Sequence, residues 1–280
     1  MKNFPKWANP DEFTLAMRCT TVKYANKFIE EGSIKFNTPD SWVKYAITNG
    51  EGRGDCFEGT VGMCHWLNIL KIKEISEKYR RYSNLTTSII GDRIYFKNNY
   101  SMQLPCFCIY IMKNNMFECP GKEGEYILKT DILGRYFKDF MDNKSKEEVN
   151  SLKDEDKPAV ILITDFDKFK KRVIKALLDL GLDESEIIFS SVTYFDFDFY
   201  GKDGWWDFGQ KFPNELTIKH KRFENQSEAR IILNTDKKEI KEYLYANAIE
   251  LGAMDDIATV VEGYFSEGIA VNLKAHIMKK

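Results

Sequence analysis

The sequence predicts an α+β fold with mixed, mainly antiparallel sheets and flanking helices. Predicted strands outnumber long helices, the two do not alternate regularly, and no internal repeat is evident. With 280 residues, 43% of them apolar and 14% aromatic, the chain can bury a substantial core. We expect one domain over residues 1–280, with the charged, apolar-poor segment 145–158 as a surface boundary between two halves.

The first elements are predicted as a strand at 12–18, a helix at 21–32 and a second strand at 33–37. The helix is predicted because apolar side chains recur with helical spacing on one stripe: Val22, Ala25, Phe28 and Ile29. Thr20 or Thr21 can cap its start, and Gly32 suits the position just after its end.

The segment from 38 to 143 should begin with a helix after the break at "NTPDSW" and then contain mostly strands. Residues 48–60 hold four glycines and are expected to form a loop whose backbone can approach a ligand closely. This loop lacks the residue order of a P-loop, so we exclude a P-loop nucleotide site. The other elements expected are strands at 92–98, 105–113 and 125–131 and helices at 71–82 and 132–143.

The second half continues the same mixture. Strands are expected at 159–163, 186–196, 216–221, 221–233 and 270–278. Helices are expected at 166–182 and 237–249, and a turn followed by a helix at 254–268.

The charge and cysteine patterns exclude several classes of protein. The chain has 41 basic and 43 acidic residues, so no overall field attracts nucleic acid or an anionic membrane. The N-terminus has no apolar signal segment and no apolar run could span a bilayer, so we expect a cytoplasmic protein with no membrane contact. Its six cysteines form no C-x-x-C pair and indicate neither a disulfide framework nor a metal site. Cys106 and Cys108 should share one face of a strand as buried side chains.

Residues 226–230 carry the pattern with the clearest chemical meaning. On a strand, Gln226, Glu228 and Arg230 share one face, whereas Ala229, Ile231 and Leu233 face the core. Same-side residues are about 6.5–7 Å apart, so the amide and the carboxylate would flank a space one sugar ring wide. A carboxylate there can accept a hydrogen bond from a ribose hydroxyl and offset positive charge at an anomeric carbon. The alternative is an ordinary surface ion pair between Glu228 and Arg230.

The Q-x-E run Gln226-Ser227-Glu228 resembles the signature motif of the ADP-ribosyltransferase superfamily. The resemblance implies an ADP-ribosyltransferase-like core in which Glu228 orients NAD and Gln226 engages the acceptor. It also implies a basic residue on the first strand, for which Arg18 is the candidate, and a Ser/Thr cluster on a middle strand. Ser190-Ser191 fits that cluster better by position than "TTS" at 86–88, although the order departs from S-T-S.

A broader likeness covers most of the chain. The ordered segments "FNTP", "GDCFEG", "PCFCIY", "RFENQSEARI" and "LGAMDDIATVV" are similar to an uncharacterised bacterial family with an early FNDPFEG-like segment and a late YxxQxEYR-like strand. Members of that family often resemble accessory proteins of mobile elements or of phage defence. The resemblance implies a bacterial protein with a role against phage, acting on a protein or nucleic-acid acceptor that could be a phage molecule.

In the transferase hypothesis, NAD is the substrate and lies between the first strand and strand 221–233. Arg18 would pair with a phosphate, Tyr24 or Tyr45 would stack on the nicotinamide, and Ser190 and Arg230 would complete the cofactor contacts. Each has an ordinary alternative. Arg18 could cover the core with its stem, and the two tyrosines could be half-buried packing residues.

Two other hypotheses remain open from the sequence. In the first, the protein is a non-catalytic sensor whose aromatic and acidic segment 195–208 binds a phage or host protein through Trp205 and Trp206, because rigid aromatic side chains dominate interfaces. In the second, it is a nuclease or other hydrolase. The candidate metal carboxylates are then Asp55, Glu58, Asp165 and Asp167, but their spacing matches no metal motif.

Overall fold

The computed structural model describes residues 9, 12–49, 54–65, 85–118, 121–122, 125–141, 143–197, 205–207 and 213–275. It is a mixed α+β structure with mainly antiparallel sheets, as predicted. In the described part of the chain the exception to antiparallel pairing is the short pair of β10 (Thr193–Phe195) and β12 (Ile218–His220), which run parallel.

A six-stranded antiparallel sheet organises the molecule. Its strand order is β14-β8-β1-β5-β13-β9. The strands are β1 (Phe13–Thr21), β5 (Cys106–Lys113), β8 (Pro158–Ile163), β9 (Ile187–Ser191), β13 (Glu228–Leu233) and β14 (Ala258–Glu262). The central strands are rich in β-branched and aromatic residues, which favour extended backbone.

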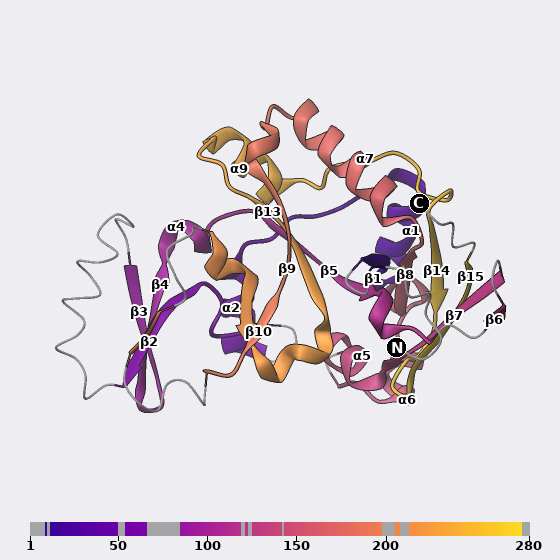
Figure 1. Ribbon diagram of the computed structural model, residues 1–280, viewed down its shortest axis with the longest axis horizontal. Coiled ribbons are helices and arrows are strands. Elements are labelled where there is room, and N and C mark those ends of the chain that lie inside the picture. Colours follow the sequence, from indigo (N-terminus) through magenta and orange to yellow (C-terminus); the bar gives the residue numbers. More distant parts are fainter. Residues whose placement is uncertain are drawn as a thin grey trace.

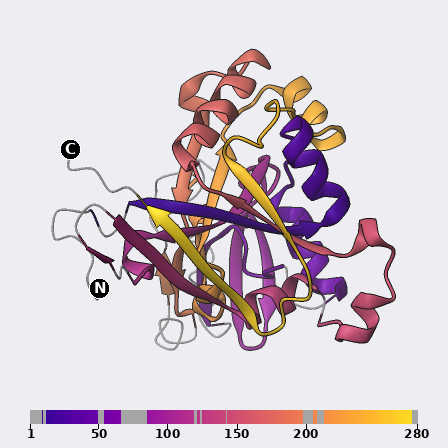
Figure 2. The same cartoon turned by 90° about the vertical axis from the view of Figure 1, so that its right-hand side faces the viewer.

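Each face of this sheet carries its own apolar core. On one face lie α1 (Val22–Glu31), α7 (Phe166–Asp179) and α9 (Lys238–Ala246), as Figure 1 shows. Ala229, Ile231 and Leu233 of β13 point into this core, as their alternation predicts. The other face is covered by α5 (Gly134–Phe140) and by β7 (Glu125–Leu133) and β15 (Gly268–Ala275), which pair side by side (Figure 2).

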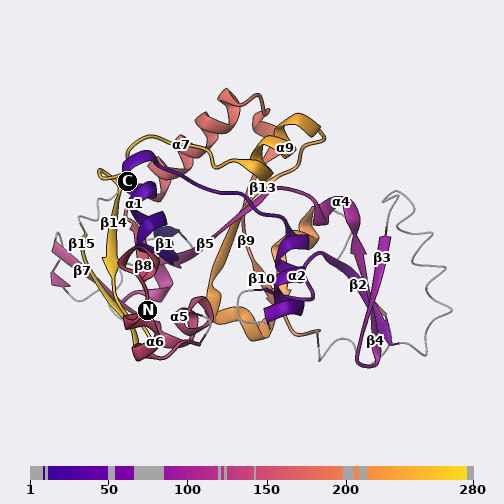
Figure 3. The ribbon, with the colours of Figure 1, turned by 180° about the vertical axis from the view of Figure 1, so that it is seen from behind.

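A second, four-stranded sheet lies apart from the first. Its order is β11-β2-β4-β3, formed by β2 (Thr60–His65), β3 (Leu85–Ile90), β4 (Arg93–Asn98) and β11 (Trp205–Asp207). Seen from behind, α2 (Pro39–Asn49) lies between the two sheets (Figure 3). The short elements are α4 (Asn99–Met102), α6 (Lys146–Asn150), β6 (Gly121–Lys122) and the 3-10 helices η2 (Asn114–Met116), η3 (Asp154–Asp156), η4 (Glu184–Glu186), η5 (Asn214–Thr217) and η6 (Lys221–Gln226).

The central strands β1 and β5 form a fork. Their pairing extends from Phe13↔Lys113 to Met17↔Tyr110 and then stops. Beyond it, β1 continues beside β8 up to Thr21↔Pro158, whereas β5 continues beside β13 up to Ile232↔Cys106. The two halves of the sheet therefore separate between Arg18 and the Cys106–Cys108 segment, although each strand keeps one partner.

Several predicted elements need correction. Residues 221–233 are not one strand, because η6 precedes β13. Segment 254–268, predicted as a turn and helix, contains the edge strand β14, whose "ATVVE" run is β-branched and pairs with β8. Segment 33–37 makes only isolated bridges.

Three further predictions concern segment 145–158, segment 71–82 and membrane-spanning helices. Segment 145–158, expected as a surface loop, holds the short helices α6 and η3. The helix expected at 71–82 lies outside the described residues. Among the residues that are described, no helix has the length and apolar character that a bilayer crossing requires.

Candidate functional site

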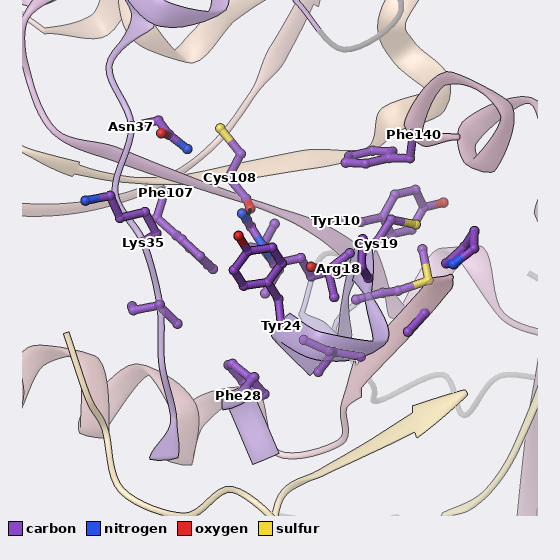
Figure 4. Close-up of a pocket in the computed structure, with 18 of the residues that line it drawn as sticks. Arg18, Cys19, Tyr24, Phe28, Lys35, Asn37, Phe107, Cys108, Tyr110 and Phe140 are labelled. Atoms are coloured by element: carbon purple, nitrogen blue, oxygen red, sulfur yellow. Dashed lines mark hydrogen bonds between the residues drawn. The ribbon is translucent and has the colours of Figure 1, made fainter. Parts of the chain in front are cut away.

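A cavity of about 1050 Å³ lies at the fork between β1 and β5. Its lining includes Phe28 and Phe107 from the core beneath α1, and Tyr110 and Tyr136 from the core beneath α5. Because these residues belong to opposite faces of the sheet, the cavity passes through the opening that the fork creates. Figure 4 shows Arg18 within it, next to Tyr24 of α1. The volume lies at the upper end of the roughly 300–1000 Å³ typical of small-molecule sites.

Most of the residues predicted from the sequence line this cavity. Six of them do so: Arg18, Tyr24, Tyr45, Gln226, Glu228 and Arg230. Ser190 does not line it. Ser190 lies on β9 opposite Arg230, and its hydroxyl donates to the carbonyl of Ser191 at 3.2 Å. The structure thus gathers residues from β1, α1, α2, η6 and β13 and leaves the expected serine cluster outside.

Glu228 and Arg230 belong to a buried ionic network. Arg230 donates through Nε to Glu228 Oε1 at 2.5 Å and through both terminal nitrogens to Glu58, at 2.7 and 2.6 Å. It also donates to the carbonyl of Leu216 at 2.6 Å, and its guanidinium lies over the Trp42 ring. Four of its five N–H donors are thus engaged, a geometry that favours holding Glu58 and Glu228 over contacting a cofactor.

Lys219 occupies the space that strand geometry would have left between Gln226 and Glu228. Its ammonium donates to Gln226 Oε1 at 2.7 Å and to Glu228 Oε2 at 2.9 Å. The predicted spacing across a sugar-sized gap is therefore wrong, because Gln226 ends η6 and a lysine side chain joins the two residues. Lys219 also lies 3.9 Å from Glu58.

Ser227 explains how both Gln226 and Glu228 reach the cavity. It has φ 37° and ψ 52°, the left-handed region that non-glycine residues seldom adopt. This reversal separates η6 from β13, and the Ser227 hydroxyl fixes it by donating to the Ile111 carbonyl at 2.7 Å. The Glu228 amide in turn donates to the Tyr194 hydroxyl at 2.8 Å. A strained residue between two cavity-lining side chains is typical of functional sites.

The network fixes the charge states of its members. Burial by itself raises the pKa of Glu228, but the charges of Arg230 and Lys219 outweigh it and hold that pKa well below its usual value. Burial lowers the pKa of Lys219, yet Glu228 and Glu58 more than compensate, so the lysine pKa is raised. These shifts favour the ionised form of both Glu228 and Lys219, so the two side chains stay charged as a pair.

Arg18 differs from Arg230 in having no ion pair with any residue that the structure describes. It is half-buried on the cavity wall, and burial lowers its pKa. Its Nη1 donates to the Cys108 carbonyl at 2.5 Å across the fork, and its guanidinium lies over the Phe107 ring, 4.3 Å from the centroid. Within the described residues no carboxylate pairs with it. It therefore presents free N–H donors to the cavity, the chemistry that binds phosphate or carboxylate.

Sequence reasoning missed two members of the network. Lys219 lies on β12 in the run "IKHK", which gave no sign that it would be buried. Glu58 was considered only as a metal ligand, but it pairs with Arg230 from the turn before β2. A buried arginine implies a buried carboxylate, so the apolar run "ARIIL" after Glu228 was the signal that could have indicated such a partner.

The backbone of Trp205 and Trp206 pairs with β2, and their side chains lie outside what the structure describes. The described residues contain no group of three or more histidine, cysteine or acidic side chains placed to hold a metal ion, and Asp165 instead caps α7. Cys106 is buried, and Cys108 lines the cavity as a thiol whose pKa burial, with Glu228 next to it, raises well above the ordinary value.

Comparisons of this chain with protein-family models, with curated proteins and with solved structures found no match.

Proposed function

We propose that this protein binds NAD in the cavity at the β1–β5 fork, with Arg18 holding a phosphate of the dinucleotide. The observation that carries the proposal is the Arg18 guanidinium, which faces a large cavity and has no carboxylate partner among the described residues. Tyr24 and Trp42 line the same cavity and supply ring faces for a base or a nicotinamide. The sequence motif adds NAD as the specific candidate. On this proposal, the forked sheet is the counterpart of an ADP-ribosyltransferase-like core.

The test is a calorimetric titration of NAD into the wild-type protein and the Arg18→Gln variant. Charge-assisted hydrogen bonds contribute about 1.5–3 kcal/mol, so the variant should bind roughly 10- to 150-fold more weakly. Arg172→Gln is the matched control, because Arg172 lies on α7, pairs with Asp256 and does not line the cavity. Its loss should leave the affinity for NAD unchanged. Equal affinity of wild type and Arg18→Gln for NAD would refute the role of Arg18.

A second candidate function is transfer of ADP-ribose to a macromolecular acceptor. Glu228 and Gln226 favour it, because both line the cavity and a carboxylate there can accept a bond from the nicotinamide ribose. Each Glu228 oxygen already accepts from one cation, at 2.5 and 2.9 Å. Lone pairs remain on both oxygens, but the charge is largely neutralised. Binding is therefore the better supported function.

Two assays test the transfer reaction. The first measures release of nicotinamide from NAD, and the second measures transfer of labelled ADP-ribose to proteins or nucleic acid of a phage-infected lysate. Glu228→Gln should lower the rate by about 10²-fold or more while NAD binding, measured in parallel, persists. NAD binding with no release by the wild type would instead favour the sensor hypothesis. In that case the 195–208 segment is the candidate surface for a phage or host protein, and Trp205→Ala with Trp206→Ala should abolish capture of that partner.

A further inference from the structure

The cavity differs in chemical character on the two sides of Arg18. In Figure 4, Lys35 and Asn37 lie on one side of Arg18, whereas the rings of Tyr110 and Phe140 lie on the other. The second side belongs to the core beneath α5, and we call it the aromatic compartment. Its lining includes six aromatic or apolar residues: Tyr110, Tyr136, Phe137, Phe140, Met141 and Phe265.

The Arg18 guanidinium borders the aromatic compartment. Burial lowers the pKa of Arg18, and Cys108, Tyr136 and Cys19 lie close enough to oppose that shift. The Tyr136 ring in turn contacts two others, with its centroid 4.8 Å from that of Tyr110 and 5.0 Å from that of Phe140. Because Arg18 and the three rings all line the same cavity, a small ligand can contact them together.

Tyr110 supplies a polar group inside the aromatic compartment. The residue is only 7% exposed, and its hydroxyl has no hydrogen-bond partner among the described residues. The hydroxyl oxygen nevertheless keeps accessible surface, and Tyr110 lines the cavity. Burial raises the pKa of Tyr110 to about 12, so the hydroxyl stays protonated and can donate or accept a hydrogen bond. Buried tyrosine hydroxyls ordinarily have a partner, so this one is available to a ligand.

We propose that the aromatic compartment binds a small phenolic carboxylic acid, with the carboxylate on Arg18 and the phenol hydroxyl bonded to the Tyr110 hydroxyl. A single carboxylate matches the one guanidinium. An aromatic ring suits edge-to-face contact with Tyr136 and Phe140, and a phenol hydroxyl can donate to or accept from Tyr110. A fatty acid lacks the hydroxyl, and an aromatic amine lacks the negative charge. The proposal does not depend on NAD. Where NAD also uses Arg18, the acid should compete with it.

The first experiment titrates the wild-type protein calorimetrically with three acids of increasing spacer length: para-hydroxybenzoate, para-hydroxyphenylacetate and para-hydroxyphenylpropionate. The acid that binds best is then compared with its analogue that lacks the hydroxyl and with para-cresol, which lacks the carboxylate. It should bind roughly 3- to 10-fold more tightly than the first and at least about 10-fold more tightly than the second. In Arg18→Gln the preference over para-cresol should disappear.

The second experiment compares Tyr110→Phe with the wild type. The variant should bind the phenolic acid roughly 3- to 10-fold more weakly and bind the analogue without the hydroxyl equally well. It should unfold at the same or a higher temperature, because no hydrogen bond between described residues is lost. Tyr264→Phe is the matched control, because the Tyr264 hydroxyl donates to the Lys144 carbonyl at 3.2 Å and Tyr264 does not line the cavity. It should lose stability and keep affinity.

The outcomes separate this proposal from the NAD proposal. If the wild type binds none of the three acids, the phenolic-acid site is wrong even where NAD binds. It is also wrong if Tyr110→Phe binds the best acid as tightly as the wild type, or if Arg18→Gln keeps the preference over para-cresol. If the acid binds through Arg18 and Tyr110 and NAD does not bind, the phenolic-acid site stands and the NAD proposal fails.

Discussion

Lys219 and Glu228 form a buried ion pair, 2.9 Å between Nζ and Oε2, that joins the short strand β12 to the central strand β13. The same carboxylate accepts from Arg230, which in turn holds Glu58 from the turn before β2. The network therefore connects the six-stranded sheet to the segment that leads into the four-stranded one. The network holds two formal charges of each sign, whereas Arg18 lines the same cavity with no carboxylate partner among the described residues.

Removal of the Lys219 ammonium should strongly destabilise the fold. Lys219→Met leaves Glu228 with one cation and Gln226 without its donor, in a region where all three residues are buried. Loss of one partner of a buried pair costs about 3–5 kcal/mol of unfolding free energy. Lys238→Met is the control, because the Lys238–Glu242 pair is exposed and should change stability by less than about 1 kcal/mol. Urea unfolding of both variants measures the difference, and equal small effects would contradict the buried network.

Asp55 should make the folded protein less stable toward unfolding as pH rises, the opposite of what most carboxylates do. Burial and the nearby Glu58 raise its pKa from 3.8 to about 6 in the folded state. The folded protein therefore holds this proton more tightly than the unfolded chain. The resulting stabilisation is complete below about pH 4 and is lost as pH rises through about 6, a change of up to about 3 kcal/mol.

The Asp55→Asn variant isolates this contribution. Its stability relative to wild type should increase between pH 4 and pH 7.5, as followed by denaturant unfolding at several pH values. Asp256→Asn is a control of opposite sign, because hydrogen bonds from Lys168 and Arg172 lower the pKa of Asp256 and its stabilisation disappears as pH falls. Parallel curves for wild type and Asp55→Asn would show that Asp55 titrates alike in both states.

At position 227 a glycine variant should be more stable than an alanine variant, the reverse of the usual order within helices and strands. At φ 37° a glycine has no steric cost, whereas an alanine keeps the strain, and both lose the bond to the Ile111 carbonyl. Ser227→Gly should therefore be more stable than Ser227→Ala by about 0.5–1 kcal/mol. Thermal unfolding of the two variants measures this. An alanine variant that equals or exceeds the glycine variant would mean that Ser227 is not held in the left-handed region.

The sequence predicted local features better than long-range ones. Two local predictions are confirmed: Ala229, Ile231 and Leu233 face the core, and a helix ends just before Gly32. Both depend only on residues a few positions apart in the sequence. The break at Ser227 was missed because serine carries no conformational signal of its own. Strand β14 was predicted as a helix although its β-branched run favours a strand, and its pairing with β8 is the long-range contact that establishes the extended backbone.

The candidate site was predicted only in part, because its local residues are visible in the sequence and its long-range partners are not. Gln226, Glu228 and Arg230 were identified as a group, and they do line one cavity with Arg18. Their partners could not be identified, because Glu58 is 172 residues from Arg230 along the chain. The fork between β1 and β5 likewise depends on which strands pair, and no local pattern in either strand marks the point at which pairing stops.

A crystal structure of the protein with NAD would show whether Arg18 binds a phosphate of the dinucleotide. The dinucleotide should lie in the cavity between β1 and β5, with a phosphate oxygen within about 3 Å of an Arg18 guanidinium nitrogen. Dinucleotide bound elsewhere on the protein, or bound in the cavity with Arg18 still free of any phosphate, would contradict it.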